Sequence, residues 1–351
     1  MIFVSDFFLF LIVLSVLLIG HELGHFLVGK WRGVKIDEFG LGFPPRILTL
    51  FESGGVKYSL NWIPFGGFVR FAGEDDPEIQ NGLSSSSILT RTLVLSAGPA
   101  ANILLGFLAF LFAFKFAAPD VNRVLIAEVL KETPAYAAGM LAGDIVEFVD
   151  DIPVQGIGDM QEAIHAQLGE TTLIVVDRDG QIVELTMIPR VEFPADQGPI
   201  GVTLSFPTAQ MGWLEASKWG VDSVVTQISA LIKLPGRLLS GQASPEEARL
   251  SGLKGIHDML SWASTIDRAS DRPFITLNLI GVISIGLALA NLLPFPALDG
   301  GRLMFVLYEA IFRRRISPRF EGIAHAIGFA ILIFLMVYIN LQDFINPISL
   351  P

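Results

Sequence analysis

Two histidines and a glutamate near the start of the chain have the spacing of a hydrolytic metal site. They form the sequence His21-Glu22-Leu23-Gly24-His25. Because positions i and i+4 share one face of a helix, both imidazoles can bind one Zn²⁺, with Glu22 beside it as general base for an attacking water. The alternative is a set of polar side chains that snorkel at a membrane interface. The apolar run before them favours a functional role, since polar groups in a membrane helix are costly.

A third ligand is expected, because catalytic zinc takes three protein ligands and leaves a fourth position to water. The best candidate is Asp299, which ends the sequence NLLPFPALD that begins at Asn291 and which precedes Gly300. The prolines and glycines around it break helical structure and let a carboxylate turn toward a site. The alternative for Asp299 alone is a helix N-cap.

Four apolar windows are long enough to cross a bilayer, which takes about 20 helical residues. The first runs from about Phe7 through the HELGH sequence to Gly29, and the others are 93–114, 274–298 and 322–342. Buried core helices are the alternative, but uncharged runs of this length are rare in soluble domains. A signal peptide is the alternative for the first window. It is disfavoured because no Lys or Arg precedes Lys30 and no clear small-residue cleavage site follows.

The basic residues between these windows predict an orientation. Lysine and arginine gather in residues 30–91 and 302–319, whereas the first ten residues and the tail after Gln342 contain none. By the positive-inside rule, the two basic loops lie in the cytoplasm, and both chain ends and the long middle loop lie outside. The HELGH end of the first window and the Asp299 end of the third then meet on the cytoplasmic side.

The composition excludes several classes of protein. The chain has 351 residues, no cysteine, a net charge of −11 and a mean hydropathy of +0.57. Only 17% of its residues are charged, against about 25% in soluble domains, which argues against a wholly soluble protein and against disorder. No nucleic-acid partner is expected, since there is no basic footprint. Without cysteine there is no disulfide framework, thiolate zinc site or cysteine nucleophile.

Residues 120–192 have the pattern of a small folded domain. The expected elements are a strand at 124–129, a short helix over 134–140, a strand at 145–149, a helix over 159–168, and a hairpin of 172–176 and 182–188. The sequence PAYAAGM from Pro134, followed by GDIV from Gly143, resembles a PDZ domain of bacterial proteases. The resemblance implies binding of extended peptides by strand addition. The alternative is a generic small α/β domain.

Two other stretches are harder to interpret. Residues 36–73 are apolar and rich in helix breakers, with strands expected at 56–60 and 67–71. They are too short and broken to span, so we expect a hairpin or loop that dips into the membrane and whose edge captures substrate by β-addition. Two amphipathic helices are expected at 213–234 and 253–263. Their position stays open between a membrane interface and ordinary packing.

Several motifs in order resemble one family. These are HELGH in the first span, the stretch from Asn291 to Arg302 at the third, and the PDZ-like domain between the second and third spans. The sequence SAGPAAN that ends at Asn102 and the stretch Phe39–Pro45 also match family segments, the latter a membrane-reentrant β element. Over nearly the whole chain, the sequence resembles the site-2 protease family of intramembrane zinc metalloproteases, in its bacterial RseP type. One departure is that many members of this type carry two tandem PDZ domains, and one is found here.

The resemblance implies roles for particular residues. It implies one zinc ion held by His21, His25 and Asp299, with Glu22 activating the water. It also implies that Asn291, and with it Asn102, holds the substrate backbone near the metal. The alternative for Asn102 is helix packing in a span rich in small residues.

The predicted fold class is a multi-pass α-helical membrane protein with four transmembrane helices, a membrane-associated β-hairpin region and one inserted PDZ domain (α+β). The expected segments are 1–30 (first helix), 31–91 (cytoplasmic loop with the β region), 92–117 (second helix), 118–205 (PDZ domain), 206–273 (amphipathic linker), 274–320 (third helix, LDGG sequence and cytoplasmic loop) and 321–351 (fourth helix and tail).

The expected function is zinc-dependent cleavage in or near transmembrane segments of membrane proteins, such as an anti-sigma factor or signal-peptide remnants. The expected location is the bacterial plasma membrane, with the active site toward the cytoplasm and the PDZ domain outside. A non-catalytic scaffold presenting a PDZ domain has no need of all four site residues. A metal-ion transporter would carry polar residues in several helices, often in repeats.

Overall fold

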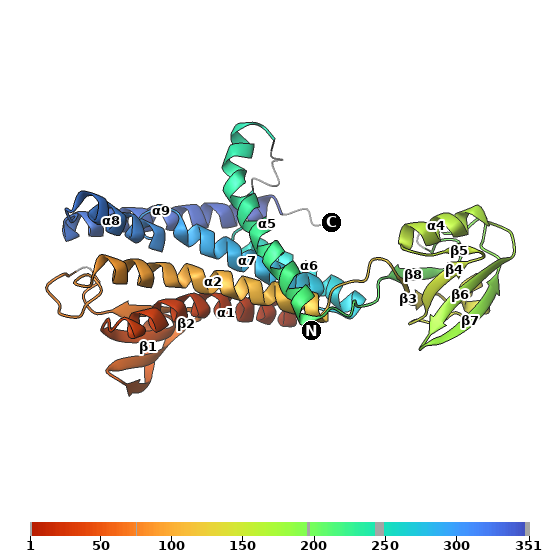
Figure 1. The fold of residues 1–351 in the computed structure, drawn as a ribbon, viewed down its shortest axis with the longest axis horizontal. Helices are drawn as coiled ribbons and strands as arrows, with labels where there is room; N and C mark the ends of the chain where they lie inside the picture. Colours follow the sequence, from red (N-terminus) through yellow and green to blue (C-terminus); the bar gives the residue numbers. More distant parts are fainter. Residues whose placement is uncertain (1, 75, 195–196, 243–248, 348–351) are drawn as a thin grey trace. The chain divides into compact units, whose positions relative to one another are not determined.

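The computed structural model describes residues 2–74, 76–194, 197–242 and 249–347. The end of the expected tail, 348–351, lies outside them. The chain divides into two compact units. The first comprises residues 1–112, 214–265 and 275–351, and the second comprises 113–213 and 266–274. Figure 1 shows the first as a bundle of long helices with a β-hairpin and the second as a small sheet with helices.

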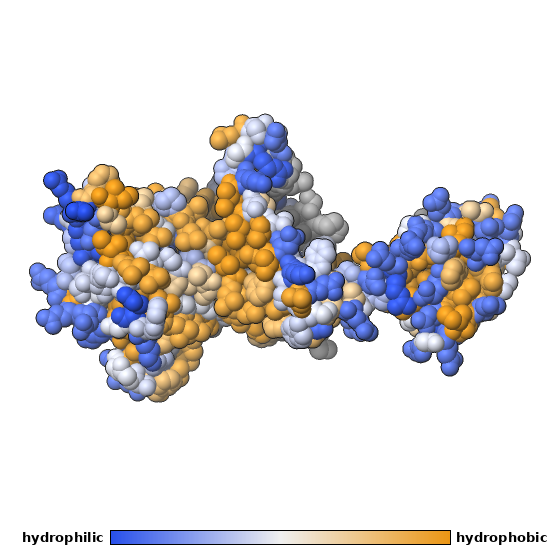
Figure 2. All heavy atoms as spheres, in the orientation of Figure 1, coloured by the Kyte–Doolittle hydropathy of each residue, from blue (hydrophilic) through white to orange (hydrophobic). Residues whose placement is uncertain are grey.

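The first unit holds most of each long apolar helix, while residues 113–116 of α2 and Phe274 of α7 belong to the second. Four helices are long and apolar enough to cross a membrane: Asp6–Trp31 within α1 (Ile2–Trp31), α2 (Ile88–Phe116), α7 (Phe274–Leu292) and α9 (Pro318–Ile345). Each overlaps one of the four predicted windows. Hydrophobic side chains cover much of this unit on the face shown in Figure 2. The large apolar residues of α9 are mostly exposed, as Phe334 illustrates at 73%, which is the pattern of a helix that faces lipid.

The third window ends earlier than the sequence pattern predicts. We expected an apolar span over 274–298, but α7 stops at Leu292 and a loop leads into α8 (Asp299–Phe312). Pro294 and Pro296 lack backbone N–H groups and cannot continue the helix. Ala297 has a φ of +79°, which reverses the chain before α8 begins. Asp299 therefore stands at the first position of a new helix.

The β region is more extensive than predicted. Strands were expected at 56–60 and 67–71, whereas the structure has two long antiparallel strands, β1 (Ile36–Ser53) and β2 (Val56–Phe71). Both bend, so that residues 38–41 of β1 pair with 57–60 on one side and with 67–70 on the other. The breakers between the two expected strands lie in the bend. Among the described residues, segment 67–70 is therefore an edge of this sheet.

The remaining helices of the first unit are α5 (Trp213–Leu239), with Trp213 assigned to the second unit, and most of α6 (Leu253–Ser270). α6 packs against α1, where Leu260 is fully buried beside Leu14 and Leu17. By contrast, α5 leaves Trp219 and other apolar side chains exposed. Ordinary packing therefore describes α6, while both interpretations of α5 stay open.

The second unit is built around an antiparallel sheet. Its strands are β3 (Val124–Val129), β4 (Ile145–Val149), β5 (Ile152–Pro153), β6 (Thr172–Arg178), β7 (Gln181–Met187) and β8 (Val202–Ser205). The strand order is β7-β6-β4-β3-β8, with β5 on β4. Its helices are α3 (Pro134–Ala137) and α4 (Ile157–Ala166). Met160 of α4 packs into one core with the sheet.

Most elements of this unit agree with the sequence pattern. β3 and β4 have the predicted bounds, and the predicted hairpin is present as β6 and β7. α3 is shorter than the expected helix over 134–140, because Gly139 takes a φ of +78° and ends it. β8 was not predicted, because four residues are too few for an alternation of apolar and polar side chains to indicate a strand.

Candidate metal centre

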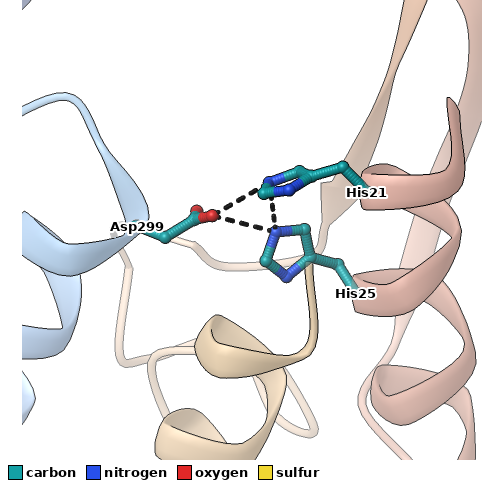
Figure 3. Close-up of side chains that lie close together, drawn as sticks. All are labelled: His21, His25 and Asp299. Carbon is teal, nitrogen blue, oxygen red and sulfur yellow. Dashed lines mark hydrogen bonds and ion pairs between the residues drawn. The ribbon is translucent and has the colours of Figure 1, made fainter. Parts of the chain in front are cut away.

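His21 and His25 lie one turn apart on α1. The side chains of both residues are about 8% exposed, and their Nε2 atoms are 3.2 Å apart. The helix places both rings on one face because their spacing is four residues. Figure 3 shows both imidazoles directed at the same point, where they meet Asp299.

Asp299 reaches this point from the start of α8. Its Oδ2 lies 3.0 Å from His21 Nε2 and 3.2 Å from His25 Nε2. The three residues form a group whose ligand atoms all lie within 4.8 Å of one another. Side chains 274 residues apart in sequence therefore converge as the spacing and the LDGG sequence predicted.

The residues fit a zinc ion in donor type and in spacing. Ligands about 2.0–2.1 Å from a tetrahedral zinc lie about 3.3 Å from each other, close to the separations of these atoms. Gly98 of α2 lines the same point, because a Cβ there would lie 2.7 Å from His21 Nε2 and closer still to His25 Nε2. The absence of a side chain at this position leaves the ligand nitrogens room to face an ion.

A backbone carbonyl fixes the tautomer of His25. Its Nδ1 lies 2.7 Å from the carbonyl oxygen of Val94 in α2. A carbonyl only accepts, so Nδ1 carries the proton and donates, and Nε2 keeps its lone pair for a metal. A hydrogen bond of this kind is the usual outer support of a metal-binding histidine.

The loop before Asp299 is held from α9. The N–H of Ala297 donates to Nδ1 of His325 at 2.8 Å. Gly328, one turn further, allows close approach, because a Cβ there would lie 2.7 Å from the carbonyl carbon of Pro296 and closer still to its carbonyl oxygen. At the start of the fourth apolar window, His325 is expected from the sequence to serve in packing or interfacial contact. Its hydrogen bond to this loop depends on the packing of α9, and no local sequence pattern indicates it.

Ion pairs anchor the body of α8. Arg91 of α2 donates to both carboxylate oxygens of Glu309, at 2.9 and 2.8 Å. Hydrogen bonds from Arg91 hold the pKa of the Glu309 carboxyl below its usual value. Arg302 pairs with Glu74 in the loop after β2. The Arg91–Glu309 pair fixes the helix that carries Asp299 against the helix that carries Gly98, and the Arg302–Glu74 pair ties it to the loop after β2.

Glu22 points toward the β region. Its Oε2 accepts a hydrogen bond from the N–H of Val69, at 3.0 Å. Alternate peptide groups of a strand point to opposite edges. The Val69 N–H donates to Glu22 of α1 and not to β1. The edge of segment 67–70 that does not pair with β1 therefore faces Glu22. The sequence did not reveal this contact, because 47 residues separate the partners.

The two predicted substrate-binding asparagines lie in different settings. Asn291 is near the end of α7, and its amide donates to the carbonyl of Leu287 in its own helix at 3.1 Å. Asn102 is fully buried on α2, with its amide nitrogen 3.3 Å from His21 Nδ1. Substrate binding by either residue stays a prediction.

The other histidines lie elsewhere. His165 of α4 lines a cavity of about 400 Å³ between α4, the stretch 197–201 and β8. The ring of His257 on α6 packs against Phe10 of α1, with centroids 5.7 Å apart. Neither belongs to the group at Asp299.

Comparison with known proteins places the chain in a family. The model of peptidase family M50 matches residues 9–335. A protein of Mesorhizobium japonicum with the provisional name of a zinc metalloprotease is 30% identical, over 95% of this chain and 97% of its own. A Clostridium acetobutylicum protein with the same kind of name is 29% identical over 97% of each chain. Metalloprotease MmpA of Caulobacter vibrioides is 28% identical over 95% of this chain and 94% of its own.

These matches agree with the structure. The chain combines four apolar helices with β-sheets, as a membrane protein of mixed α and β content does. The names of its relatives imply zinc, and its clustered histidines and aspartate suit that ion. The chain belongs to peptidase family M50, the site-2 protease family, and is a metallopeptidase.

Proposed function

We propose that this protein is an intramembrane zinc endopeptidase that cleaves peptide bonds in or near the transmembrane segments of other membrane proteins. One observation carries the proposal. The two histidines of the metal-binding group lie within the apolar stretch Asp6–Trp31 of α1. Polar groups at such a position are costly unless they act on something in the membrane. A site at this location would act on peptide bonds that lie in or near the membrane.

The proposed site holds one zinc ion per chain on His21, His25 and Asp299. A zinc ion held there polarises a substrate carbonyl and lowers the pKa of water to about 7. Glu22, beside His21, takes a proton from the attacking water at its carboxylate. It then returns that proton to the nitrogen that leaves when the peptide C–N bond breaks. Val69, through its N–H, holds one carboxylate oxygen of Glu22 in place for both transfers.

Substrate is presented to this site as an extended strand. A helix hides its carbonyls in hydrogen bonds, so a transmembrane substrate must unwind locally before attack. Segment 67–70 offers an edge, and the Val69 N–H on that edge points at Glu22. A strand added there would lie beside the general base. Asn291, near the end of α7, holds the substrate backbone in this proposal.

We assign the second unit to a PDZ domain that recognises substrate. β8 is the last strand in the order of its sheet, and the cavity beside it is lined by α4 and by the glycine-rich stretch 198–201. A strand edge next to a helix is the arrangement used to bind an extended peptide by strand addition. In this role the domain excludes large ectodomains or senses a trimmed substrate end.

The proposed location is the bacterial plasma membrane, with the zinc site toward the cytoplasm and the PDZ domain outside. The basic loops around 30–91 and 302–319 support this orientation. Anti-sigma factors and remnants of signal peptides are substrates of the proposed class. A scaffold without catalysis is not favoured, because it needs neither the clustered ligands nor Glu22.

Mapping of the cleaved bond tests the proposal. Purified protein is incubated in detergent micelles or vesicles with a single-span model protein, and the products are sequenced by mass spectrometry. We expect zinc-dependent cleavage at a bond within or beside the apolar segment. Cleavage only in the soluble part, at sites many residues from the apolar segment, would contradict intramembrane action while leaving a metallopeptidase.

A further inference from the structure

Asn102 shares a helix face with the other α2 residues that touch the two histidines. Val94, Gly98 and Asn102 are spaced four residues apart, so they stand above one another on α2. The carbonyl of Val94 meets His25 Nδ1, and Gly98 lies against both rings. Asn102 approaches Nδ1 of His21. This face of α2 therefore places one polar group beside the Nδ1 atom of each histidine: the Val94 carbonyl beside His25 and the Asn102 amide beside His21.

The amide of Asn102 leaves one polar atom in an unfavourable setting. Its Nδ2 lies 3.3 Å from His21 Nδ1, whereas its Oδ1 is buried and has no hydrogen-bond partner in the part of the chain described. Nearly all buried polar atoms in proteins are paired. The side chain itself is fully buried, so exposure to solvent does not satisfy that oxygen.

The chemistry of a metal-binding histidine decides which amide atom faces the ring. If His21 offers Nε2 to zinc, its Nδ1 must carry the proton and act as a donor. An amide NH₂ group is also a donor and cannot pair with it, whereas Oδ1 can accept. The two atoms exchange places by a half turn of the amide, which has nearly the same shape in both positions.

We propose that Asn102 is a positioning residue for His21, whose side-chain carbonyl accepts the Nδ1–H and so directs Nε2 toward the metal. This inference rests on the proposed function, because the proton position follows from zinc on Nε2. In this role Asn102 accepts the Nδ1–H of His21, as the Val94 carbonyl accepts the Nδ1–H of His25. It also replaces substrate binding as the role of Asn102.

Zinc affinity tests the proposal directly. The full-length protein and its variants are purified in detergent, and the zinc dissociation constant is measured by competition with a chelator. Asn102→Leu removes the acceptor at similar volume, and we expect about 10- to 100-fold weaker zinc binding. Asn102→Asp keeps an acceptor but has no donor, and we expect an affinity at least equal to that of the wild type.

A neighbouring hydroxyl provides the matched control. Ser284 of α7 donates to the backbone carbonyl of Asn102 at 2.7 Å and is equally buried. Ser284→Ala therefore removes a buried hydrogen bond at the same level of the bundle without touching the Asn102 amide. We expect this variant to bind zinc as the wild type does.

Three results would overturn the inference. Wild-type zinc affinity in Asn102→Leu would show that the amide does not support His21. Equal losses in Asn102→Leu and Asn102→Asp would assign the amide a donor or packing role. A raised KM with unchanged zinc affinity would return Asn102 to substrate binding.

If Asn102→Leu does not fold, Asn102→Ala takes its place. A wild-type protein that binds no zinc would instead contradict the proposed function, before any variant is compared.

Discussion

At the scale of single residues, Gly98 determines whether the two imidazoles can face one ion. A Cβ at this position would lie 2.7 Å from His21 Nε2 and closer to His25 Nε2. Real Cβ atoms are not found at such distances, so Gly98→Ala must push one or both rings away from the ligand position. We expect at least tenfold weaker zinc binding, measured by chelator competition.

Gly286 supplies the control for this substitution. It lies on α7 with no atom within 4 Å of a Cβ built there, so Gly286→Ala adds the same methyl group in open space. We expect wild-type zinc affinity. Equal behaviour of Gly98→Ala and Gly286→Ala would show that the close contact at Gly98 plays no part in metal binding.

Residue spacing predicted part of this site and could not predict the rest. His21 and His25 are visible in the sequence because a helix brings positions i and i+4 together. Asp299 is visible because prolines and glycines mark a helix start. The contact of His325 with Ala297 and that of Val69 with Glu22 depend on packing between distant segments. No periodicity within one segment encodes such a contact.

At the scale of elements, the edge of segment 67–70 should carry substrate. Val69→Pro removes the N–H that donates to Glu22. In a Glu22→Ala background no acceptor side chain remains at position 22 for this N–H, so any further effect of Val69→Pro reports on the edge itself. We expect Val69→Pro to weaken crosslinking of a single-span substrate at unchanged zinc content.

Leu50→Pro is the matched control for the edge. Leu50 lies in β1 on the far side of the sheet, is 47% exposed and has no Cα partner in the β1–β2 register, and proline is tolerated at such positions. Unchanged substrate crosslinking in Val69→Pro, or an equal loss in Leu50→Pro, would rule out capture on this edge.

The second unit has a buried ion pair that makes its stability depend on pH. Arg178 donates to both oxygens of Asp144, each at 2.7 Å, and the Asp144 side chain is 1% exposed. Burial raises the pKa of Asp144, but the hydrogen bonds from Arg178 and the Leu141 N–H outweigh it and hold the pKa below its usual value. The stabilisation is present above about pH 3.9 and is lost as pH falls through the folded pKa.

Hydrogen exchange in this unit measures the effect. At pH 7, Arg178→Met should lower its free energy of unfolding by about 1.5–3 kcal/mol, because a buried carboxylate loses its partner. The deficit should shrink as pH falls below 4. Arg123→Met removes the two ion pairs of a side chain that is 41% exposed, and it should cost less than about 1 kcal/mol. A deficit for Arg178→Met that stays constant with pH would contradict this account.

Prediction of the elements was most accurate where the pattern was local. The bounds of β3 and β4 agree because alternation within a few residues defines them. The end of α7 was placed six residues too late, since Leu293–Leu298 is as apolar as the helix before it. Apolar composition measures affinity for the membrane, whereas the prolines and the positive φ of Ala297 decide where the helix stops.

At the scale of the whole molecule, the proposed PDZ domain should decide which substrates reach the metal site. Residues 119 and 208 form an isolated bridge, and Asp120 N–H donates to the Pro207 carbonyl at 2.8 Å. The ends of the intervening segment are therefore adjacent, and a short linker can replace residues 121–206. We expect this deletion to increase cleavage of a substrate with a large ectodomain and to leave cleavage of a trimmed substrate unchanged.

The ratio of the two cleavage rates is the measurement for this prediction. A ratio equal to that of the full chain would exclude a filter in the second unit. Loss of cleavage for both substrates at full zinc content would instead assign the unit a positive role in recruiting substrate. Loss of zinc from the deletion variant would show that the metal centre depends on this unit.

The most direct test of the central claim compares the wild type with Glu22→Gln. Both purified proteins are incubated with a single-span model substrate, and zinc is counted in each. We predict about one zinc ion per chain in both proteins. We also predict that the wild type cleaves the substrate and that the cleavage rate of Glu22→Gln is lower by about 10²–10⁴-fold. Absence of zinc from both, or equal cleavage by both, would contradict a zinc peptidase that uses Glu22 as its base.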